Sequence, residues 1–323
     1  MNYKQQFAEI ASKPILVIGD VMVDSYIWGS VERISPEAPV PVVCVTHTEH
    51  RLGGAANVAK NLVALGLQPI VCTVIGADDA GNILRNLLCE SGISVEQCIV
   101  NNQRKTTVKT RILSGNHQIL RVDNEQTNTI SPDITDTLCK NIQKMFASKS
   151  VAAIVFQDYD KGVITKELIQ YVTKFAQKYS VPVFVDPKKR NFLDFNSVTL
   201  FKPNFKEFTE GIGRTCKKQD NEHLFILAKE FMLKHDITMV MITLSEYGIF
   251  IANQSEFIHI PSQVRHVADV SGAGDTVIST AVACYLAQLP MSDIARISNI
   301  AAGLACEQPG VVTITLEQLI KQV

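Results

Sequence analysis

The strongest constraint on the fold is a regular alternation of two kinds of segment along the 323 residues of the chain. Short, uninterrupted apolar runs, such as P-I-L-V-I-G (14–19) and Q-P-I-V-C-T-V-I-G (68–76), alternate with longer segments that have helical spacing, the first at 53–65. A strand that is apolar at every position is buried on both faces, which is typical of a parallel sheet covered by helices on each side. The sequence therefore predicts an α/β fold, a three-layer α/β/α sandwich with a mostly parallel central sheet. Further strands are expected at 151–156, 181–186 and 237–243, and further helices at 79–91, 132–147, 165–179, 220–235, 273–288 and 291–306.

Two segments, 21–47 and 104–123, depart from this alternation. They switch between apolar and polar residues at every position, as in K-T-R-I-L and Q-I-L-R-V. A period of two is typical of an antiparallel sheet with one exposed face. No low-complexity linker separates these segments from the rest of the chain. We therefore predict a single domain, residues 1–323, in which 21–47 and 104–123 form a small β-sheet lid over the mouth of the main sheet.

Composition and charge exclude several classes of function. The formal net charge of −1 provides no basic field for nucleic acid or an anionic membrane surface. No window approaches the roughly 18 apolar residues of a membrane span, and the N-terminus lacks the apolar run of a signal peptide. The cysteines and histidines show no C-x-x-C or H-E-x-x-H spacing. We therefore expect a cytoplasmic protein without a nucleic-acid or membrane partner and without a structural metal.

The stretch A-D-V-S-G-A-G-D-T (268–276) places three small residues directly before Asp275 and an expected helix. The three residues are Gly272, Ala273 and Gly274. Free amides at the positive end of a helix dipole form an anion site. A carboxylate there would repel a resting anion, but it could take a proton from an alcohol that attacks a phosphoryl group held by the amides. On this loop alone, a simple helix cap by Ser271 or Asp275 is an equal alternative.

A second glycine motif occurs earlier, in L-G-G-A-A-N-V-A (52–59). Gly53 and Gly54 precede an expected helix, and Asn57 lies in its first turn. No G-K-[ST] follows, so the motif is not a Walker loop, and the absence of G-x-G-x-x-G after the first strand disfavours a nicotinamide-dependent dehydrogenase. We interpret the glycines as positions where a polar ligand approaches the backbone, with Asn57 available for sugar hydroxyls.

These two motifs, together with N-F-K-E (204–207) and T-L-S-E-Y-G (243–248), occur in the same order in the ribokinase-type family of carbohydrate kinases. The chain resembles that family from about residue 14 to 310. The resemblance implies a ribokinase-like fold, ATP and Mg²⁺ as cofactors, and a monovalent cation as an open addition. It also implies that Asp275 is the catalytic base and that the residues before it form the anion hole.

Within that family the chain is similar to the D-glycero-β-D-manno-heptose-7-phosphate kinases. The stretches that carry this similarity include G-D-V-M-V-D-S-Y (19–26), R-I-S-P-E-A-P-V-P-V (33–42), Q-I-L-R-V-D (118–123), D-Y-D-K-G (158–162) and V-D-P-K (185–188). The resemblance implies ATP-dependent phosphorylation of the anomeric oxygen to heptose 1,7-bisphosphate, a step towards the ADP-heptose of lipopolysaccharide. Many relatives also carry a nucleotidyltransferase domain. Because this chain ends at Val323, we expect a separate protein to supply that activity. A kinase for another sugar, such as ribose or fructose 6-phosphate, and a non-enzymatic sugar-binding protein remain alternatives.

The resemblance also implies contacts to the sugar phosphate. Carboxylate, amide and backbone groups would bind the sugar, and cations would bind its distal phosphate, for which guanidinium groups are well suited. The expected residues are Asp24, Gly53, Gly54, Asn57, Lys109, Arg111, Arg121, Asp186 and Lys188. For the lid cations, a charged strand edge is the alternative. For Asp186 and Lys188 the alternative is a structural salt bridge.

The implied contacts to nucleotide and metal come from the second half of the chain. Asn204 and Glu207 would organise Mg²⁺ through water, since Mg²⁺ keeps several waters. For Glu207 the alternative is an ordinary acid at the start of a helix. The expected cofactor-binding residues are Asn204, Phe205, Lys206, Glu207, Thr243, Ser245, Gly248, Asn299 and Gly303. The lid would expose apolar strand surface in a single chain, so we predict a homodimer formed by the lid strands of two chains.

Overall fold

The computed structural model describes residues 2–115, 117–148, 151–263 and 266–323. Its main sheet has the strand order β13-β12-β11-β10-β9-β8-β1-β4-β5. In this spatial order, all neighbouring strands between β11 and β5 pair in parallel. The remaining strands, β12 and β13, continue the sheet in antiparallel pairing. The bounds are β1 Pro14–Gly19, β4 Gln68–Gly76, β5 Cys98–Asn101, β8 Ala153–Gln157, β9 Val183–Asp186, β10 Leu200–Phe201, β11 Met239–Thr243, β12 Ile249–Ala252 and β13 Phe257–Ile260. The prediction of a mostly parallel sheet is confirmed.

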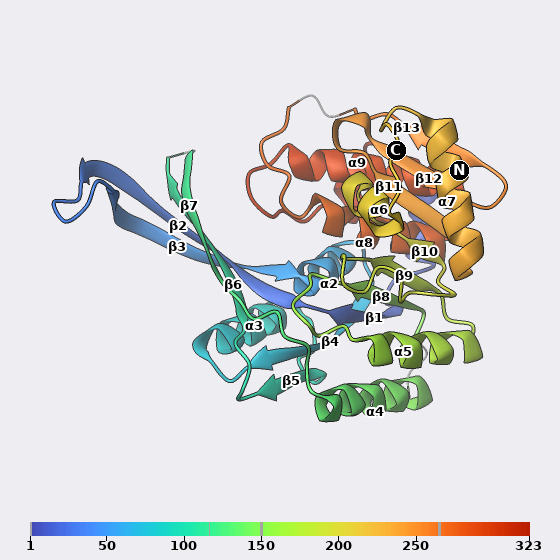
Figure 1. Cartoon of the computed structure of the whole chain (residues 1–323), viewed down its shortest axis with the longest axis horizontal. Coiled ribbons are helices and arrows are strands. Elements are labelled where there is room, and N and C mark those ends of the chain that lie inside the picture. Colours follow the sequence, from blue (N-terminus) through green and yellow to red (C-terminus); the bar gives the residue numbers. More distant parts are fainter. Residues whose placement is uncertain (1, 116, 149–150, 264–265) are drawn as a thin grey trace.

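Helices cover both faces of this sheet, which explains the continuous apolar runs. In β1, Ile15 and Val17 face a core shared with α2, α3, α8 and α9, whereas Leu16 and Ile18 face a core shared with α4, α5 and α7. Figure 1 shows the sheet between these two helical layers. The bounds are α1 Tyr3–Ala8, α2 Ala55–Ala64, α3 Asp79–Glu90, α4 Pro132–Ser148, α5 Lys166–Lys178, α6 Phe205–Ile212, α7 Asn221–His235, α8 Ala273–Leu286, α9 Met291–Cys306 and α10 Leu316–Ile320, with a 3₁₀ turn η1 at Ser245–Tyr247. No helix in the described ranges is long and apolar enough to cross a bilayer.

A second sheet has the order β3-β2-β6-β7 and projects away from the main body as two long ribbons (Figure 1). Its strands are β2 Val21–Ile34, β3 Pro41–Gly54, β6 Thr107–Ser114 and β7 His117–Asn124. The two alternating segments of the sequence therefore form one sheet, which we call the lid. The helix expected from residue 53 begins at Ala55 instead, because Gly53 and Gly54 are still paired with β2. This pairing places the glycine motif at the root of the lid.

Candidate active site

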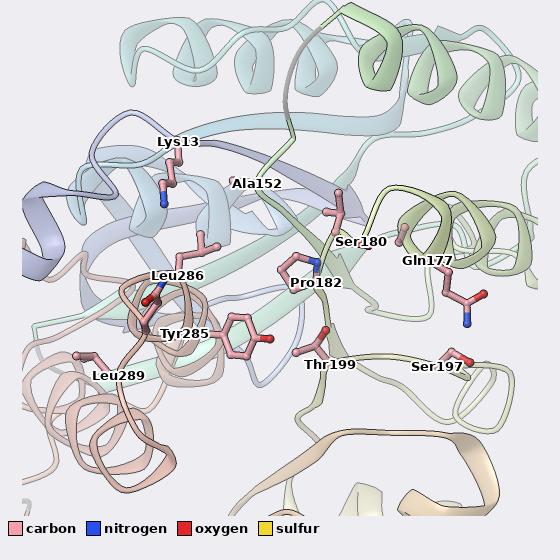
Figure 2. Close-up of a pocket in the computed structure, with 13 residues that line it drawn as sticks. Lys13, Ala152, Gln177, Ser180, Pro182, Ser197, Thr199, Tyr285, Leu286 and Leu289 are labelled. Carbon is pink, nitrogen blue, oxygen red and sulfur yellow. The ribbon is translucent and has the colours of Figure 1, made fainter.

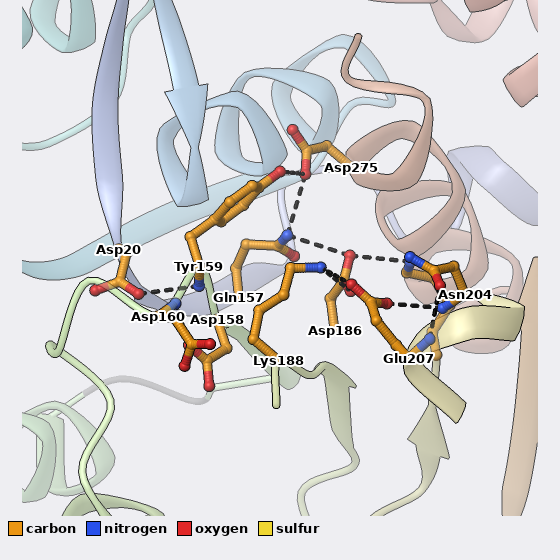
Figure 3. Close-up of polar contacts among 11 residues, drawn as sticks. Asp20, Gln157, Asp158, Tyr159, Asp160, Asp186, Lys188, Asn204, Glu207 and Asp275 are labelled. Carbon is orange, nitrogen blue, oxygen red and sulfur yellow. Dashed lines mark hydrogen bonds and ion pairs between the residues drawn. The ribbon is translucent and has the colours of Figure 1, made fainter. Parts of the chain in front are cut away.

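Polar side chains gather at the carboxyl ends of the central strands, where the lid joins the main sheet. Asp20 follows β1, Gln157 ends β8, Asp186 ends β9 and Lys202 follows β10, and all four are buried. Parallel strands bring their carboxyl ends to one edge of a sheet, which is where α/β folds bind ligands. Figure 3 shows Asp20, Gln157 and Asp186 with their partners as one connected network.

Asp275 lies in the first turn of α8 with only 3% of its surface exposed. Its Oδ2 accepts a hydrogen bond from Nδ2 of Asn57 (2.7 Å). Its Oδ1 accepts one from the hydroxyl of Tyr159 (2.8 Å) and one from Nε2 of Gln157 (3.1 Å) (Figure 3). The N-cap residue of α8 is Gly272, which has no side-chain cap bond, so the alternative in which Ser271 or Asp275 only caps the helix is wrong.

The environment of Asp275 raises the pKa of its carboxyl to about 7. Burial raises it most, because a low-dielectric interior disfavours the charged form. The hydrogen bonds from Asn57 and Tyr159 lower the pKa, while the nearby charge of Asp186 raises it further. A general base works best when its pKa lies near the working pH. The site therefore holds a carboxylate suited to taking a proton at neutral pH.

The small residues before Asp275 leave room at the start of α8. Gly272 has a φ of +80°, and a Cβ there would lie 3.0 Å from Nδ2 of Asn57. A Cβ on Gly274 would have nothing nearer than Nζ of Lys202 at 3.7 Å and an oxygen of Asp186 at 3.8 Å. The amide of Ala273 donates to the carbonyl oxygen of Val270 (3.3 Å). The loop thus opens towards a buried ammonium group, and one of its three amides is already bonded within the chain.

Two lysines and two acids form a charge cluster beside this loop. Nζ of Lys202 lies 2.9 Å from Oδ2 of Asp186, and both side chains are almost fully buried. Nζ of Lys188 lies 4.0 Å from the other oxygen of Asp186 and contacts Glu207. Burial lowers the pKa of Lys188, but the charges of Asp186 and Glu207 outweigh it and raise the pKa above its ordinary value. The two lysines thus bring their ammonium groups to this edge of the sheet, where they could bind phosphate groups.

The N-F-K-E motif forms the start of α6. Oδ1 of Asn204 accepts from the amide of Glu207, and Oε2 of Glu207 accepts from the amide of Asn204, each at 2.8 Å. This is a capping box, so Glu207 does cap the start of α6, and the same carboxylate also pairs with Lys188. Phe205 is half-buried against the core. Lys206 is exposed and pairs with Glu210, pointing to a surface role.

The residues expected at the nucleotide fall into two places. Thr243, at the end of β11, bridges to Asn204, and Ser245 and Gly248 follow in a turn where both have positive φ. Asn299 and Gly303 lie on α9 and line a separate cavity of about 350 Å³, together with Gln263. The structure thus joins Thr243 to the start of α6, whereas Asn299 and Gly303 border a distinct hollow.

The lid residues expected at the sugar phosphate also separate into two groups. Asp24 on β2 forms an ion pair with Arg111 on β6, and both side chains are largely buried. Gly53 makes room for this pair, because a Cβ there would lie 2.3 Å from Oδ2 of Asp24. Lys109 and Arg121 instead contact Asp123, and the side chain of Arg121 is 53% exposed. The structure therefore joins Asp24 to Arg111 and leaves Arg121 at the outer strand.

Some residues at this site were not predicted from the sequence. Gln157 and Tyr159 stand in F-Q-D-Y (156–159), directly after a buried strand, and that position was a signal for ligand-facing groups. Lys202 follows the two-residue strand β10, which is too short to be recognised from its pattern. Arg51 lies on β3, where its guanidinium covers the ring of Tyr26 at 4.8 Å and Nη1 reaches the carbonyl oxygen of Val311 (3.4 Å).

A hollow at the opposite end of the sheet takes no part in this arrangement. The cavity has a volume of about 670 Å³ and is lined by Lys13, Pro182, Thr199 and Tyr285, among others, which Figure 2 shows as sticks. Lys13, Pro182 and Thr199 stand just before β1, β9 and β10, at their amino ends. The residues named as its lining include none that were predicted to bind substrate or cofactor. This cavity therefore lies away from the residues that were predicted to bind substrate or cofactor.

Comparison with known proteins identifies relatives for nearly the whole chain. The sequence model of the pfkB family carbohydrate kinases matches residues 12–318. The bifunctional protein HldE of Geobacter sulfurreducens is 38% identical over 320 residues, which cover 99% of this chain and 64% of that protein. The chain therefore spans about two thirds of the length of the curated relatives it matches.

Solved structures share the fold. Phosphofructokinase-2 from Escherichia coli, in complex with potassium, superposes with a TM-score of 0.78 at 18% identity, covering 96% of this chain and 97% of that one. Ribokinase from Arabidopsis thaliana, complexed with ribose and ATP, superposes with a TM-score of 0.71 at 18% identity, covering 96% and 98%. The prediction of a ribokinase-like sandwich with a β lid is confirmed.

Proposed function

Because the chain belongs to the pfkB family of carbohydrate kinases, we propose that it phosphorylates D-glycero-β-D-manno-heptose 7-phosphate at the anomeric oxygen. ATP is the donor, and heptose 1,7-bisphosphate is the product on the way to ADP-heptose and lipopolysaccharide core. The observation that carries the proposal is the buried Asp275 carboxylate at the mouth of a small-residue loop, beside two lysines. The stretches shared with heptose kinases, above all 19–26 and 158–162, support the choice of sugar.

Asp275 acts as the general base. Its carboxylate takes the proton of the anomeric hydroxyl as that oxygen forms a bond to the γ-phosphorus, and the bond from that phosphorus to the bridging oxygen of ADP breaks. The pKa of about 7 leaves a large deprotonated fraction at neutral pH. The proton remains on Asp275 until products leave.

Charge on the transferred group is balanced by fixed donors and cations. The loop at Gly272 and Gly274 supplies backbone groups, and Lys202 lies 3.7 Å from the Cβ position of Gly274. Lys188 and Lys202 together bring two positive charges to this edge of the sheet. Such preorganised groups stabilise charge that develops in the transition state without reorganising.

ATP and Mg²⁺ fit the groups present on the nucleotide side. Asn204 and Glu207 bring amide and carboxylate oxygens to the start of α6, and Mg²⁺ prefers oxygen ligands and keeps several waters. Glu207 and Asn204 would hold it through water, and when bound it would neutralise phosphate charge. Thr243, Ser245 and Gly248 would contact the nucleotide. Asn299 and Gly303 line the cavity on α9, which would hold the adenine of ATP. In this proposal the enzyme works in the cytoplasm, where ATP is available.

The lid binds the sugar phosphate and joins two copies of the chain. Asp24 would accept sugar hydroxyls, and Arg111, with Lys109, would bind the distal phosphate. Leu120 and Val122 alternate with Arg121 along β7, so they lie on the face opposite Arg111, and their exposed fractions are 53% and 48%. This exposed apolar surface supports a homodimer through the lids.

The test is a substrate panel with a base variant. We expect kcat/KM with ATP to be highest for heptose 7-phosphate, compared with ribose and fructose 6-phosphate, with a 1,7-bisphosphate product identified by phosphorus NMR. Asp275→Asn should lower kcat by about 100-fold or more, because it removes the general base, with an unchanged circular dichroism spectrum. Near-normal turnover of that variant would refute the assigned base. A higher kcat/KM for another sugar would refute the substrate, and tight sugar binding without ATP turnover would favour a binding protein.

A further inference from the structure

We propose that Tyr159 is a positioning residue for Asp275: its hydroxyl holds the base in its charged form and directs one carboxylate oxygen to the substrate. This inference rests on the proposed role of Asp275. The hydroxyl lies 2.8 Å from Oδ1 of Asp275 (Figure 3). A carboxylate can only accept, so the phenol must be the donor. Burial and the charge of Asp275 raise the pKa of Tyr159 well above its ordinary value, so it stays a donor at any assay pH.

The tyrosine is held by the backbone of its own loop. The carboxylate of Asp20 accepts the amides of Tyr159 (2.9 Å), Lys161 (3.0 Å) and Val163 (2.9 Å). Because Asp20 follows β1 directly, this loop is fixed to the centre of the main sheet. The ammonium of Lys188 also lies 5.6 Å from the centre of the Tyr159 ring. Several contacts therefore fix the position of the phenol. They also explain the D-Y-D-K-G stretch as the loop that holds this tyrosine in place.

The hydrogen bonds to Asp275 distinguish its two carboxylate oxygens. Oδ1 accepts from both Tyr159 and Gln157, which fills its two lone pairs. Oδ2 accepts only from Asn57 among the bonds of the described residues, so one lone pair stays open for the sugar hydroxyl. Tyr159 thus selects Oδ2 as the reacting atom. It also offsets the burial that raises the pKa of Asp275 to about 7, since it donates to the charged form.

The experiment compares pH profiles of kcat/KM for the wild type, Tyr159→Phe and Tyr171→Phe. Tyr159→Phe keeps the ring and removes the donor, so the pKa of Asp275 rises. We expect the acidic limb of the profile to move up by about one pH unit, with a roughly fivefold loss at pH 7 that recovers towards pH 9. The KM for ATP should not change. Tyr171→Phe is the matched control, since that hydroxyl bonds Gln143 on the exposed surface of α4 and α5 (3.0 Å) and should leave the profile unchanged.

The outcomes separate the positioning role from its premise. If Asp275→Asn abolishes turnover while Tyr159→Phe leaves the acidic limb in place, the positioning role is refuted and the base stands. A loss that is equal at every pH and accompanied by a lower Tm would mean that Tyr159 only packs, and this also refutes the proposal. If Asp275→Asn keeps its turnover, the proposed function fails first and the inference falls with it.

Discussion

The edge of the main sheet and the lid each contain a largely buried pair of an aspartate and a cation, in contrasting surroundings. Asp186 and Lys202 lie at the ends of β9 and β10, under helices and within a network that reaches Asp275 through Gln157. Asp24 and Arg111 lie on β2 and β6 of a sheet that projects from the body (Figure 1). The same ion chemistry therefore occurs beneath the helices and at the buried root of the lid.

This contrast indicates that the two ion pairs have different roles. The network around Asp275 joins β8, β9, α2 and α8, so its groups keep their positions without a ligand, as a preorganised site requires. The strands of the lid have exposed residues along much of their length. Regions with few buried contacts are those that open and close around substrates. We expect the first pair to govern stability and the second to govern substrate binding.

The largest expected effect comes from Lys202→Met. It leaves the carboxylate of Asp186 buried without its nearest cation, which should lower the free energy of unfolding by about 3–5 kcal/mol. Urea unfolding at pH 8 measures this loss. Lys321→Met, which removes a cation from an exposed pair with Glu317, should leave the free energy of unfolding almost unchanged.

A double variant sharpens this result. Lys202→Met with Asp186→Leu replaces the pair by apolar groups and should recover most of the stability, since breaking a buried pair costs more than replacing it. Turnover should stay low, because the cation beside Gly274 is gone. If the Lys202→Met protein were as stable as Lys321→Met, the expectation that the Asp186–Lys202 pair governs stability would be wrong.

An intermediate effect is expected from Arg111→Met in the lid. If Arg111 binds the distal phosphate, losing its charged hydrogen bonds should raise the KM for the sugar phosphate by about 10- to 100-fold and leave the KM for ATP unchanged. Steady-state kinetics with each substrate varied separately measures this. Arg214→Met, at an exposed pair with Glu230, is the control. A fall in unfolding free energy as large as that of Lys202→Met would show that the lid pair is structural instead.

The smallest effect on folding should come from Leu120→Lys on the outer face of the lid. The side chain is 53% exposed, so the free energy of unfolding should change by no more than about 0.5 kcal/mol. A buried lysine would weaken a lid-to-lid contact, so light scattering at micromolar concentration should show dimers of the wild type and monomers of the variant. Ile226→Lys, at an equally exposed position on α7, should remain dimeric. A monomeric wild type would contradict the proposed assembly.

The sequence alone predicted the layers, the lid and the place of Asp275 between a small-residue loop and a helix. Strands buried on two faces, strands buried on one face and a glycine loop before a helix each have their own local pattern. It did not reveal β12 and β13, whose runs of four residues are too short to identify. Tertiary structure decided which groups meet. Tyr159 reaches Asp275 across 116 positions and Asn57 reaches it across 218. Only the side-by-side packing of parallel strand ends, joined to the start of α8, brings such distant residues within hydrogen-bond distance, and no local pattern records that distance.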